Sequence, residues 1–391
     1  MNWERQKPFT VEQPLPPASG NWLLGGVLSA IAAILLFILH ASGRLSAINS
    51  VSIWLFSLIP VVLWLIAFSA RGYFYGRELD RYHFLQREAQ YAQQQWAAWA
   101  GRYLAVMASC VMLPEQISAA LLQQKAKGLT HYRDLVRRID YLPNDKPVFV
   151  TAISALLSSV AEAVLALPGE LPLQVTVLTD EPDASRQDLH TQFAECWQAI
   201  FPTCAEPPST TITDTLAFSM VAERIKQPDE TVKLVLVVQM QGQDRYSDGL
   251  AVLLLTSDDV ALKYSIAHQA RLLRPASWYV NHFGEELQLF LTTQTQALRT
   301  VGILGDAQKW SGHSAELLNI GNTHGARWKP GDIQTVETYC GKQGTCSPWL
   351  AAALAADFVR LSQQSWLTLS SSGTEHFICT ITSGSEDESV Q

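Results

Sequence analysis

The stretch that decides the fold is VKLVLVVQMQGQDRYSDGLAVLLLT, which runs from Val232 to Thr256. Its first part, residues 232–239, is a run of aliphatic and β-branched residues of strand length. Its last part, residues 249–256, is a second such run and is apolar at successive positions. Strands that are buried on both faces of a sheet have this composition. The stretch therefore predicts two strands of a largely buried sheet.

Short apolar runs alternate with helical patterns on both sides of this stretch. Further strands are predicted at residues 147–151 (PVFVT) and 173–178, and helices at 152–167, 185–200 and 213–226. Two last strands, residues 366–370 and 376–382, predict a hairpin across Gly373. Strands that alternate with helices indicate an α/β domain with a mixed, largely buried sheet, which we place at residues 131–383.

Two uncharged apolar runs precede this domain. Residues 22–39 read WLLGGVLSAIAAILLFIL, and residues 51–70 read VSIWLFSLIPVVLWLIAFSA. Each run is long enough to cross the hydrocarbon core of a membrane, where a helix is the open-ended structure that satisfies its own backbone. They predict a transmembrane helical hairpin at residues 21–71. A stripe of small residues suits close packing of the two helices: Gly25, Gly26, Ser29 and Ala33.

The basic residues predict the orientation of this hairpin. Arg44 alone lies between the two apolar runs, whereas several basic residues flank them: Arg5, Lys7, Arg71, Arg77, Arg81 and Arg87. Positive charge is enriched on the cytoplasmic side of membrane proteins. We therefore expect both termini in the cytoplasm and the hairpin in a bacterial inner membrane. Residues 1–20 are expected to form a flexible cytoplasmic tail, and residues 384–391 an acidic tail.

Residues 72–130 are predicted to form a helical juxtamembrane segment. Up to residue 127 this segment has one proline, Pro114, and its apolar and aromatic residues recur near helical spacing. We expect it to continue the second membrane helix as a stalk, with packing on the following domain as the alternative.

The overall composition disfavours several classes of function. A formal net charge of -8 gives no global basic field for DNA or RNA, so no nucleic-acid partner is expected. Six cysteines in 391 residues form neither a disulfide framework nor a zinc ribbon, and the Cys340–Cys346 spacing matches no common zinc pattern. The sequence has no glycine-rich phosphate-binding loop of the usual kinds. No metal or cofactor is therefore expected.

From about Asp214 onwards, the order of elements resembles the second half of a thiolase-like, or β-ketoacyl synthase-like, domain. The run Asp248-Gly249-Leu250-Ala251 matches the turn between an acid and a glycine that precedes a buried strand in that family. A glycine-rich loop, an alanine-rich helix around residues 351–356 and the final hairpin follow in the family's order. The resemblance implies a thiolase-like fold for the cytoplasmic domain.

The catalytic residues of that family do not carry over with the order of elements. Condensing enzymes use a nucleophilic cysteine at a helix N-terminus together with nearby histidines. The loop that is expected to supply a histidine reads Gly344-Thr345-Cys346-Ser347, and the second expected histidine motif has Tyr339 and Cys340 instead. We therefore predict no catalytic residue and no enzymatic activity. The alternative is a membrane-tethered acyl or thioester enzyme with Cys346 or Cys340 as its nucleophile.

A membrane anchor joined to a degenerate thiolase-like domain resembles accessory proteins of bacterial type VI secretion clusters. This resemblance implies a protein partner, either a secretion component or an effector. Two regions supply candidate partner-binding residues, the polar segment 319–332 and the aromatic segment 271–290. The candidates are Asn319, Asn322, His324, Arg327, Trp328, Trp278 and Tyr279. A plain surface connection accounts for the first segment equally well, and burial in the core accounts for the second segment better than exposure.

Overall fold

The computed structural model describes residues 3, 11–42, 52–124, 134–182, 186–202, 208–227, 229–279 and 282–384. The chain divides into two compact units. The α/β unit consists of Met1–Glu4 and Trp96–Gln391, and the helical unit consists of Arg5–Gln95.

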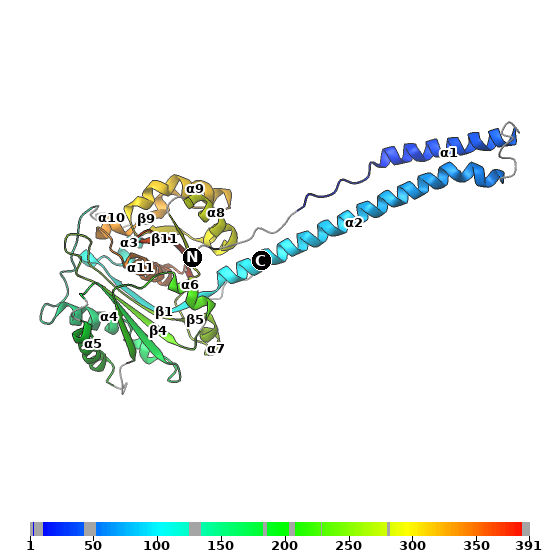
Figure 1. Ribbon diagram of the computed structural model, residues 1–391. Helices are drawn as coiled ribbons and strands as arrows, with labels where there is room; N and C mark the ends of the chain where they lie inside the picture. Colours follow the sequence, from blue (N-terminus) through cyan, green and yellow to red (C-terminus); the bar gives the residue numbers. More distant parts are fainter. Residues whose placement is uncertain are drawn as a thin grey trace. The chain divides into compact units, whose positions relative to one another are not determined.

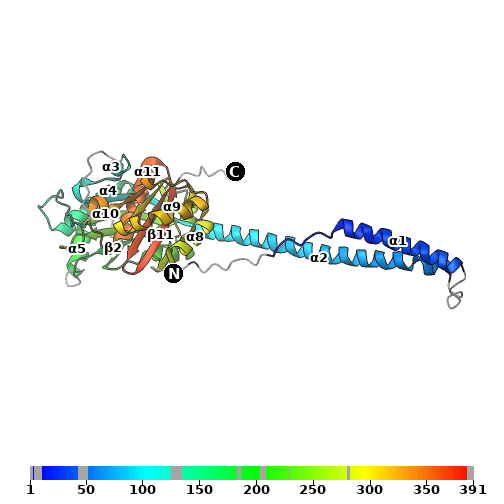
Figure 2. The ribbon, with the colours of Figure 1, turned by 90° about the horizontal axis from the view of Figure 1, so that it is seen from above.

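The helical unit is an antiparallel pair of helices, α1 (Ser19–Ala41) and the first part of α2 (Ile53–Gly101), and both views show them side by side (Figures 1 and 2). The expected close packing at Gly25 and Gly26 is present. A Cβ atom added to Gly26 would lie 3.0 Å from the ring of Trp64. The Trp64 indole also donates a hydrogen bond to the carbonyl of Trp22 at 3.2 Å. α2 stays helical through Pro60 and continues to Gly101.

Three helices in the described ranges are long and apolar enough to cross a membrane: α1, α2 and α4 (Val148–Leu165). They differ in what covers them. No residue of α1 is buried, and its leucines are widely exposed, with Leu23 at 70%. In α4, by contrast, the residues at positions i, i+3, i+4 and i+7 from Phe149 are buried against the sheet. The apolar composition of α4 is therefore explained by the core of the α/β unit.

The strands of the α/β unit that lie in the described ranges form one sheet, in the order β3-β2-β4-β5-β1-β6-β11-β10-β8-β9, with β7 paired to β11 (Figure 1). Their bounds are β1 Tyr103–Met112, β2 Leu173–Thr179, β3 Ser209–Thr213, β4 Val232–Gln239, β5 Gly249–Ser257, β6 Ala270–Leu273, β7 Ala276–Tyr279, β8 Gly302–Gly305, β9 Ile333–Thr335, β10 Trp366–Ser372 and β11 Glu375–Ser383.

The sheet consists of two halves that repeat one topology. In the first half, β2 lies parallel to both β3 and β4, β4 is antiparallel to β5, and β5 is antiparallel to β1. In the second half, β8 lies parallel to β9 and β10, β10 is antiparallel to β11, and β11 is antiparallel to β6. The antiparallel pair of β1 and β6 joins the halves. By this order, β2 corresponds to β8 and β4 to β10.

Helices lie between the two halves and outside each of them, as Figure 1 shows. The inner helices pack in one core cluster with both halves: α3 (Ala119–Gln123), α6 (Met220–Lys226) and α11 (Ser347–Ser362). The outer helices are α4 and α5 (Arg186–Ile200) on the first half, and α8 (Phe283–Thr293) and α9 (Ser314–Thr323) on the second. Shorter connecting elements are α7 (Asp258–Lys263), α10 (Val336–Cys340) and the 3-10 turns at Pro114–Gln116, Thr295–Arg299, Gln308–His313 and Pro330–Asp332.

The side chains of β4 alternate between two of these cores. Val235 and Val237 face the inner helices, whereas Leu234, Leu236 and Val238 face α4 and α5. A strand covered on both faces needs apolar residues at every position. The prediction of two buried strands at residues 232–239 and 249–256 is therefore confirmed, and the predicted hairpin across Gly373 is present as β10 and β11.

Three sequence predictions are wrong. Residues 147–151 are not a strand, because Val148 already begins α4. Residues 213–226 do not form one helix, because β3 ends at Thr213 and α6 begins at Met220. Residues 72–130 are not helical throughout: residues 103–112 form β1, which lies at the centre of the sheet between β5 and β6. The α/β unit accordingly resumes at Trp96 and not at residue 131.

The N-terminal Trp3 belongs to the α/β unit, although residues 1–20 were expected to form a flexible tail. Its side chain is 7% exposed and stacks on Phe290 with ring centroids 5.2 Å apart. It also meets the edge of Trp99 at 5.3 Å, and its Nε1 donates to the carbonyl of Pro275 at 3.2 Å. The chain therefore leaves the α/β unit after Glu4 and returns to it at Trp96.

The last turn of α2 is fixed within the α/β unit by buried side chains. Arg274 Nε donates to the carbonyl of Trp99 at 3.2 Å, and its guanidinium lies 4.2 Å from the Trp99 ring centroid. Gln294 Nε2 donates to the carbonyl of Ala100 at 2.8 Å. These donors satisfy carbonyl groups that the end of a helix leaves without partners.

Candidate functional site

A buried acid stands where the second half of the sheet meets the N-terminus of α11. Asp306 directly follows β8 and is 1% exposed. Its carboxylate accepts hydrogen bonds from Ser347 Oγ at 2.7 Å, from the Ser371 amide at 2.8 Å and from Trp310 Nε1 at 2.6 Å. Burial raises the pKa of Asp306, and these three hydrogen bonds oppose that shift. The acid thus ties together β8, β10 and α11.

Aromatic rings fill the space between α6 and α11 beside this acid. Phe218 lies 5.1 Å from Trp349 and 5.4 Å from Phe377, both in edge-to-face geometry. All three side chains are at most 1% exposed. Trp349 Nε1 donates to the carbonyl of Leu216 at 2.9 Å, which joins the approach to α6 to the first turn of α11. The three rings therefore pack on one another between the strands and the inner helices.

The cysteines that the sequence offered as nucleophiles lie in this inner core. Cys346 precedes α11 and Cys340 ends α10; they are 3% and 1% exposed. A helix N-terminus normally lowers the pKa of a thiol. Here burial has the opposite effect and raises the pKa of both thiols to about 12. At pH 7 the thiolate fraction is on the order of 10⁻⁵. Condensing enzymes carry their nucleophilic cysteine at a helix N-terminus. The described residues before the inner helix α6, residues 208–219, contain no cysteine.

The predicted partner-binding residues fall into exposed and buried groups. Asn319 and Asn322 lie on α9, so the segment 319–332 begins with five helical residues, 319–323, and is not one long loop. Both asparagines and Arg327 are exposed, and His324 is half-buried with its Nδ1 2.8 Å from the Ile320 carbonyl. Together with His324, these residues leave a polar surface open to solvent.

The two predicted tryptophans lie in the core. Trp328 is 4% exposed, and its Nε1 donates to the carbonyl of Thr300 at 3.1 Å. Trp278 is 2% exposed and packs against Phe283 at 5.6 Å. Tyr279 pairs with Glu375 through its backbone, and its side chain lies outside the described part of the structure. The interpretation that the aromatic segment 271–290 packs in the core is therefore correct for Trp278.

No cluster of three or more histidine, cysteine or acidic side chains in the described ranges has the arrangement of a metal site. The five cysteines in those ranges, Cys110, Cys196, Cys340, Cys346 and Cys379, are free thiols.

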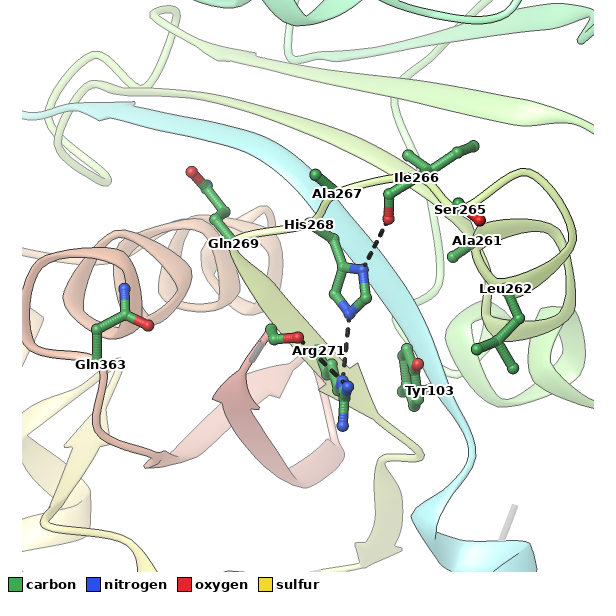
Figure 3. A pocket seen from close by; sticks show the side chains of 11 residues that line it. Tyr103, Ala261, Leu262, Ser265, Ile266, Ala267, His268, Gln269, Arg271 and Gln363 are labelled. Carbon is green, nitrogen blue, oxygen red and sulfur yellow. Dashed lines mark hydrogen bonds between the residues drawn. The ribbon is translucent and has the colours of Figure 1, made fainter. Parts of the chain in front are cut away.

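A second site, which sequence reasoning missed, is a pocket at the opposite end of β11 from Asp306 (Figure 3). Its volume is about 530 Å³. Arg271 on β6 lies between Tyr103, at the start of β1, and His268. The guanidinium carbon is 4.8 Å from the Tyr103 ring centroid, and Nε donates to His268 Nε2 at 3.2 Å. No sequence motif predicts this pocket, because its residues come from four separate parts of the chain.

Comparison with known proteins finds similar solved structures and no matching sequence family. No protein-family model and no curated protein sequence matches the chain. Among solved structures, one similar chain comes from a type II polyketide synthase acyl-carrier protein in complex with its ketosynthase bound to the hexaketide. It has a TM-score of 0.51 and 11% identity, and the match covers 73% of this chain and 99% of that one.

Another similar structure is ketosynthase twelve from the bacillaene polyketide synthase of Bacillus amyloliquefaciens. Its TM-score is 0.50 at 10% identity, and the match covers 73% of each chain. At such identities the likeness concerns the fold alone. The α/β unit therefore has a thiolase-like fold with a mixed sheet, which confirms the fold expected from the sequence.

Proposed function

We propose that this protein is a non-enzymatic accessory or scaffold protein of a bacterial inner membrane, and that its thiolase-like unit binds a protein partner. The observation that carries the proposal is the filled centre of the fold. Phe218, Trp349 and Phe377 occupy the space between the inner helices, and Cys346 beside them is buried and protonated. A core in which the described thiols Cys340 and Cys346 are buried and protonated supports binding over condensation.

The proposed membrane topology rests on α1, α2 and the position of Trp3. No residue of α1 is buried and Leu23 is 70% exposed, which favours a lipid environment. Trp3 and Trp99 contact each other within the α/β unit, so the chain segments before α1 and after α2 meet in that unit. This contact supports an even number of membrane crossings. Two spans, α1 and the first part of α2, with both termini in the cytoplasm, satisfy this condition and the distribution of basic residues.

Our proposed partner is a component or effector of a type VI secretion apparatus. The proposed contact surface is the exposed polar group on and after α9: Asn319, Asn322, His324 and Arg327. In one of the similar structures a ketosynthase is bound to an acyl-carrier protein, so a thiolase-like fold does present surfaces to protein partners. Affinity purification of the tagged full-length chain in mild detergent, followed by mass spectrometry, tests this.

Enrichment of secretion baseplate, membrane-complex or effector proteins is the expected result. It should be lost in an Arg327→Glu variant and kept in an Arg360→Glu variant, whose exposed residue lies on α11, outside the polar group on α9. Co-purification of acyl-carrier or lipid-synthesis proteins alone would argue against the proposed partner.

The alternative function is a membrane-tethered acyl or thioester enzyme. The fold favours it, because the similar solved structures are ketosynthases. A thiol-reactive acyl analogue separates the two proposals. We expect the folded protein to react at Cys110, which is half-buried, and not at Cys346 or Cys340. Rapid labelling that disappears in Cys346→Ala or Cys340→Ala, but not in Cys110→Ala, would establish the enzyme instead.

A further inference from the structure

At the pocket around Arg271, the described lining residues carry one positive charge and no negative charge. Among the described residues that line it, Arg271 alone is permanently charged. None of the lining residues is acidic, and no ion pair joins Arg271 to a described carboxylate. A partly buried guanidinium without a counter-ion favours the approach of an anion.

The guanidinium is held in a fixed orientation. Its face lies against Tyr103, Nε donates to His268 Nε2, and Nη2 donates to the carbonyl of Gly384 at 3.3 Å. Since His268 Nε2 accepts this bond, its proton sits on Nδ1, which lies 3.2 Å from the carbonyl of Ile266.

Three N–H donors of Arg271 are left over. A guanidinium has five such donors, and the described contacts use two of them. The remaining donors form the flat edge that pairs with two oxygens of one carboxylate or phosphate. Side chains such as Leu262 and Ile266 supply an apolar wall, so the pocket accommodates an anionic head with an apolar body.

We propose that this pocket is a binding site for a carboxylate ligand with an apolar body, with Arg271 as the residue that pairs with the carboxylate. It is distinct from the centre of the fold. Ser371, which contacts Asp306, pairs with His376 near the start of β11, whereas Gly384 follows the end of that strand. The length of β11 separates the two places by roughly 25 Å.

A carboxylate of this kind has two sources. One is a free small molecule. The other is the chain itself, because the sequence continues from Gly384 through Glu386, Asp387 and Glu388.

Binding of phenylacetate and of uncharged phenylacetamide to the full-length protein in detergent tests the proposal, with ligand-observed NMR as the measurement. We expect phenylacetate to bind with a Kd on the order of 1 mM and phenylacetamide at least tenfold more weakly. Arg271→Gln should weaken phenylacetate binding at least tenfold, whereas Arg360→Gln should leave it unchanged. Equal binding of acid and amide, or native-like binding by Arg271→Gln, would overturn the proposal.

Two further variants keep the test decisive. Leu262→Trp narrows the pocket at a 64% exposed position without touching Arg271, so it should also weaken binding even where Arg271→Gln fails to fold; native-like binding by this variant overturns the proposal. A chain that ends at Gly384 identifies the source. Tighter phenylacetate binding in that chain means that the acidic C-terminal residues compete for the same site, and unchanged binding means that the site serves a free ligand.

Discussion

The two halves of the sheet place an aspartate at the same point but bury it differently. Asp180 directly follows β2, and Asp306 directly follows the corresponding β8. Each accepts an amide from the end of the neighbouring parallel strand, Gln241 and Ser371 respectively, and both distances are 2.8 Å. Asp180 is half-buried, whereas Asp306 is 1% exposed. The repeated topology thus sets the backbone contact, and the surrounding helices set the environment of the acid.

The inner helices explain this difference. The first half contributes α6, which has seven residues, among them Glu223, Arg224 and Lys226. The second half contributes α11, which has sixteen residues, the first thirteen of them buried. Ser347 at the start of α11 covers Asp306, while Phe218 before α6 fills the space between the helices. The second half therefore supplies the polar contact to Asp306, and Phe218 of the first half completes the aromatic packing with Trp349.

Removal of the Trp349 ring, which lies where the two halves meet, should have the largest effect on the free energy of unfolding. Trp349→Ala deletes a buried indole that contacts Phe218 and leaves the Leu216 carbonyl without its donor. We expect a loss of about 5 kcal/mol in the free energy of unfolding. Denaturant titration of the full-length protein in detergent measures it. Leu361→Ala, at a 43% exposed position on the same helix, should cost less than about 1 kcal/mol. Similar losses for the two variants would refute the role of the aromatic junction.

Replacement of the two corresponding aspartates measures the difference between the halves directly. Asp306→Ala leaves the donors of Ser347, Ser371 and Trp310 buried without an acceptor, and should cost about 4 kcal/mol. Asp180→Ala loses the amides of Met240 and Gln241, but water can reach these groups, so the expected cost is about 1 kcal/mol. Equal costs in thermal or denaturant unfolding would show that the helices do not distinguish the two sites.

The sequence predicted the parts of the fold whose pattern is local. Residues 232–239 are uniformly apolar and become β4 with the predicted bounds, and Gly373 marks the hairpin. β1 escaped prediction because YLAVMASCVM contains alanine, methionine and leucine, which favour helices in isolation. It becomes a strand because β5 and β6 flank it. In residues 147–151, β-branched residues suggested a strand, yet spacing from Phe149 onwards buries one helix face.

The candidate sites depend on long-range contacts and were less predictable. Asp306 meets residues 41 and 65 positions away, and the pocket of Arg271 joins Tyr103 to Gly384. Trp278 and Trp328 were sensible candidates for a surface, because an aromatic residue looks the same in sequence whether it is exposed or buried. Chain folding decides between these outcomes, and both residues lie in the core.

A pH-dependent loss of stability should distinguish α11 from α6. Asp357 on α11 is 5% exposed, and burial raises its pKa from 3.8 to about 6, although Ser109 donates to it at 2.7 Å. The folded state therefore holds this proton more tightly than the unfolded chain. The stability that this group contributes is present below pH 4 and is lost as the pH rises towards 6. The expected loss is roughly 3 kcal/mol.

Asp357→Asn isolates this contribution, because an asparagine can still accept from Ser109 and does not ionise. The variant should match the native protein near pH 4 and exceed its free energy of unfolding by roughly 3 kcal/mol at pH 8. Glu223→Gln on α6, where the side chain is 45% exposed, should leave the pH dependence unchanged. A native-like pH profile in Asp357→Asn would mean that the acid ionises without cost in the folded protein.

The smallest expected effect concerns two connections that are equivalent in the two halves, β4 to β5 and β10 to β11. β10 and β11 join through the two residues Gly373 and Thr374, whereas β4 and β5 are joined by a longer connection. Gly373 has a φ of 59°, a left-handed value that a side chain disfavours. Gly373→Ala should lower the free energy of unfolding by about 1 kcal/mol. Gly169→Ala is the matched control in the first half, because a Cβ atom there meets nothing within 4 Å and no left-handed φ is required; it should be neutral or slightly stabilising. If both substitutions have the same effect, the tight turn does not depend on its glycine, and the difference between the two connections lies in their length alone.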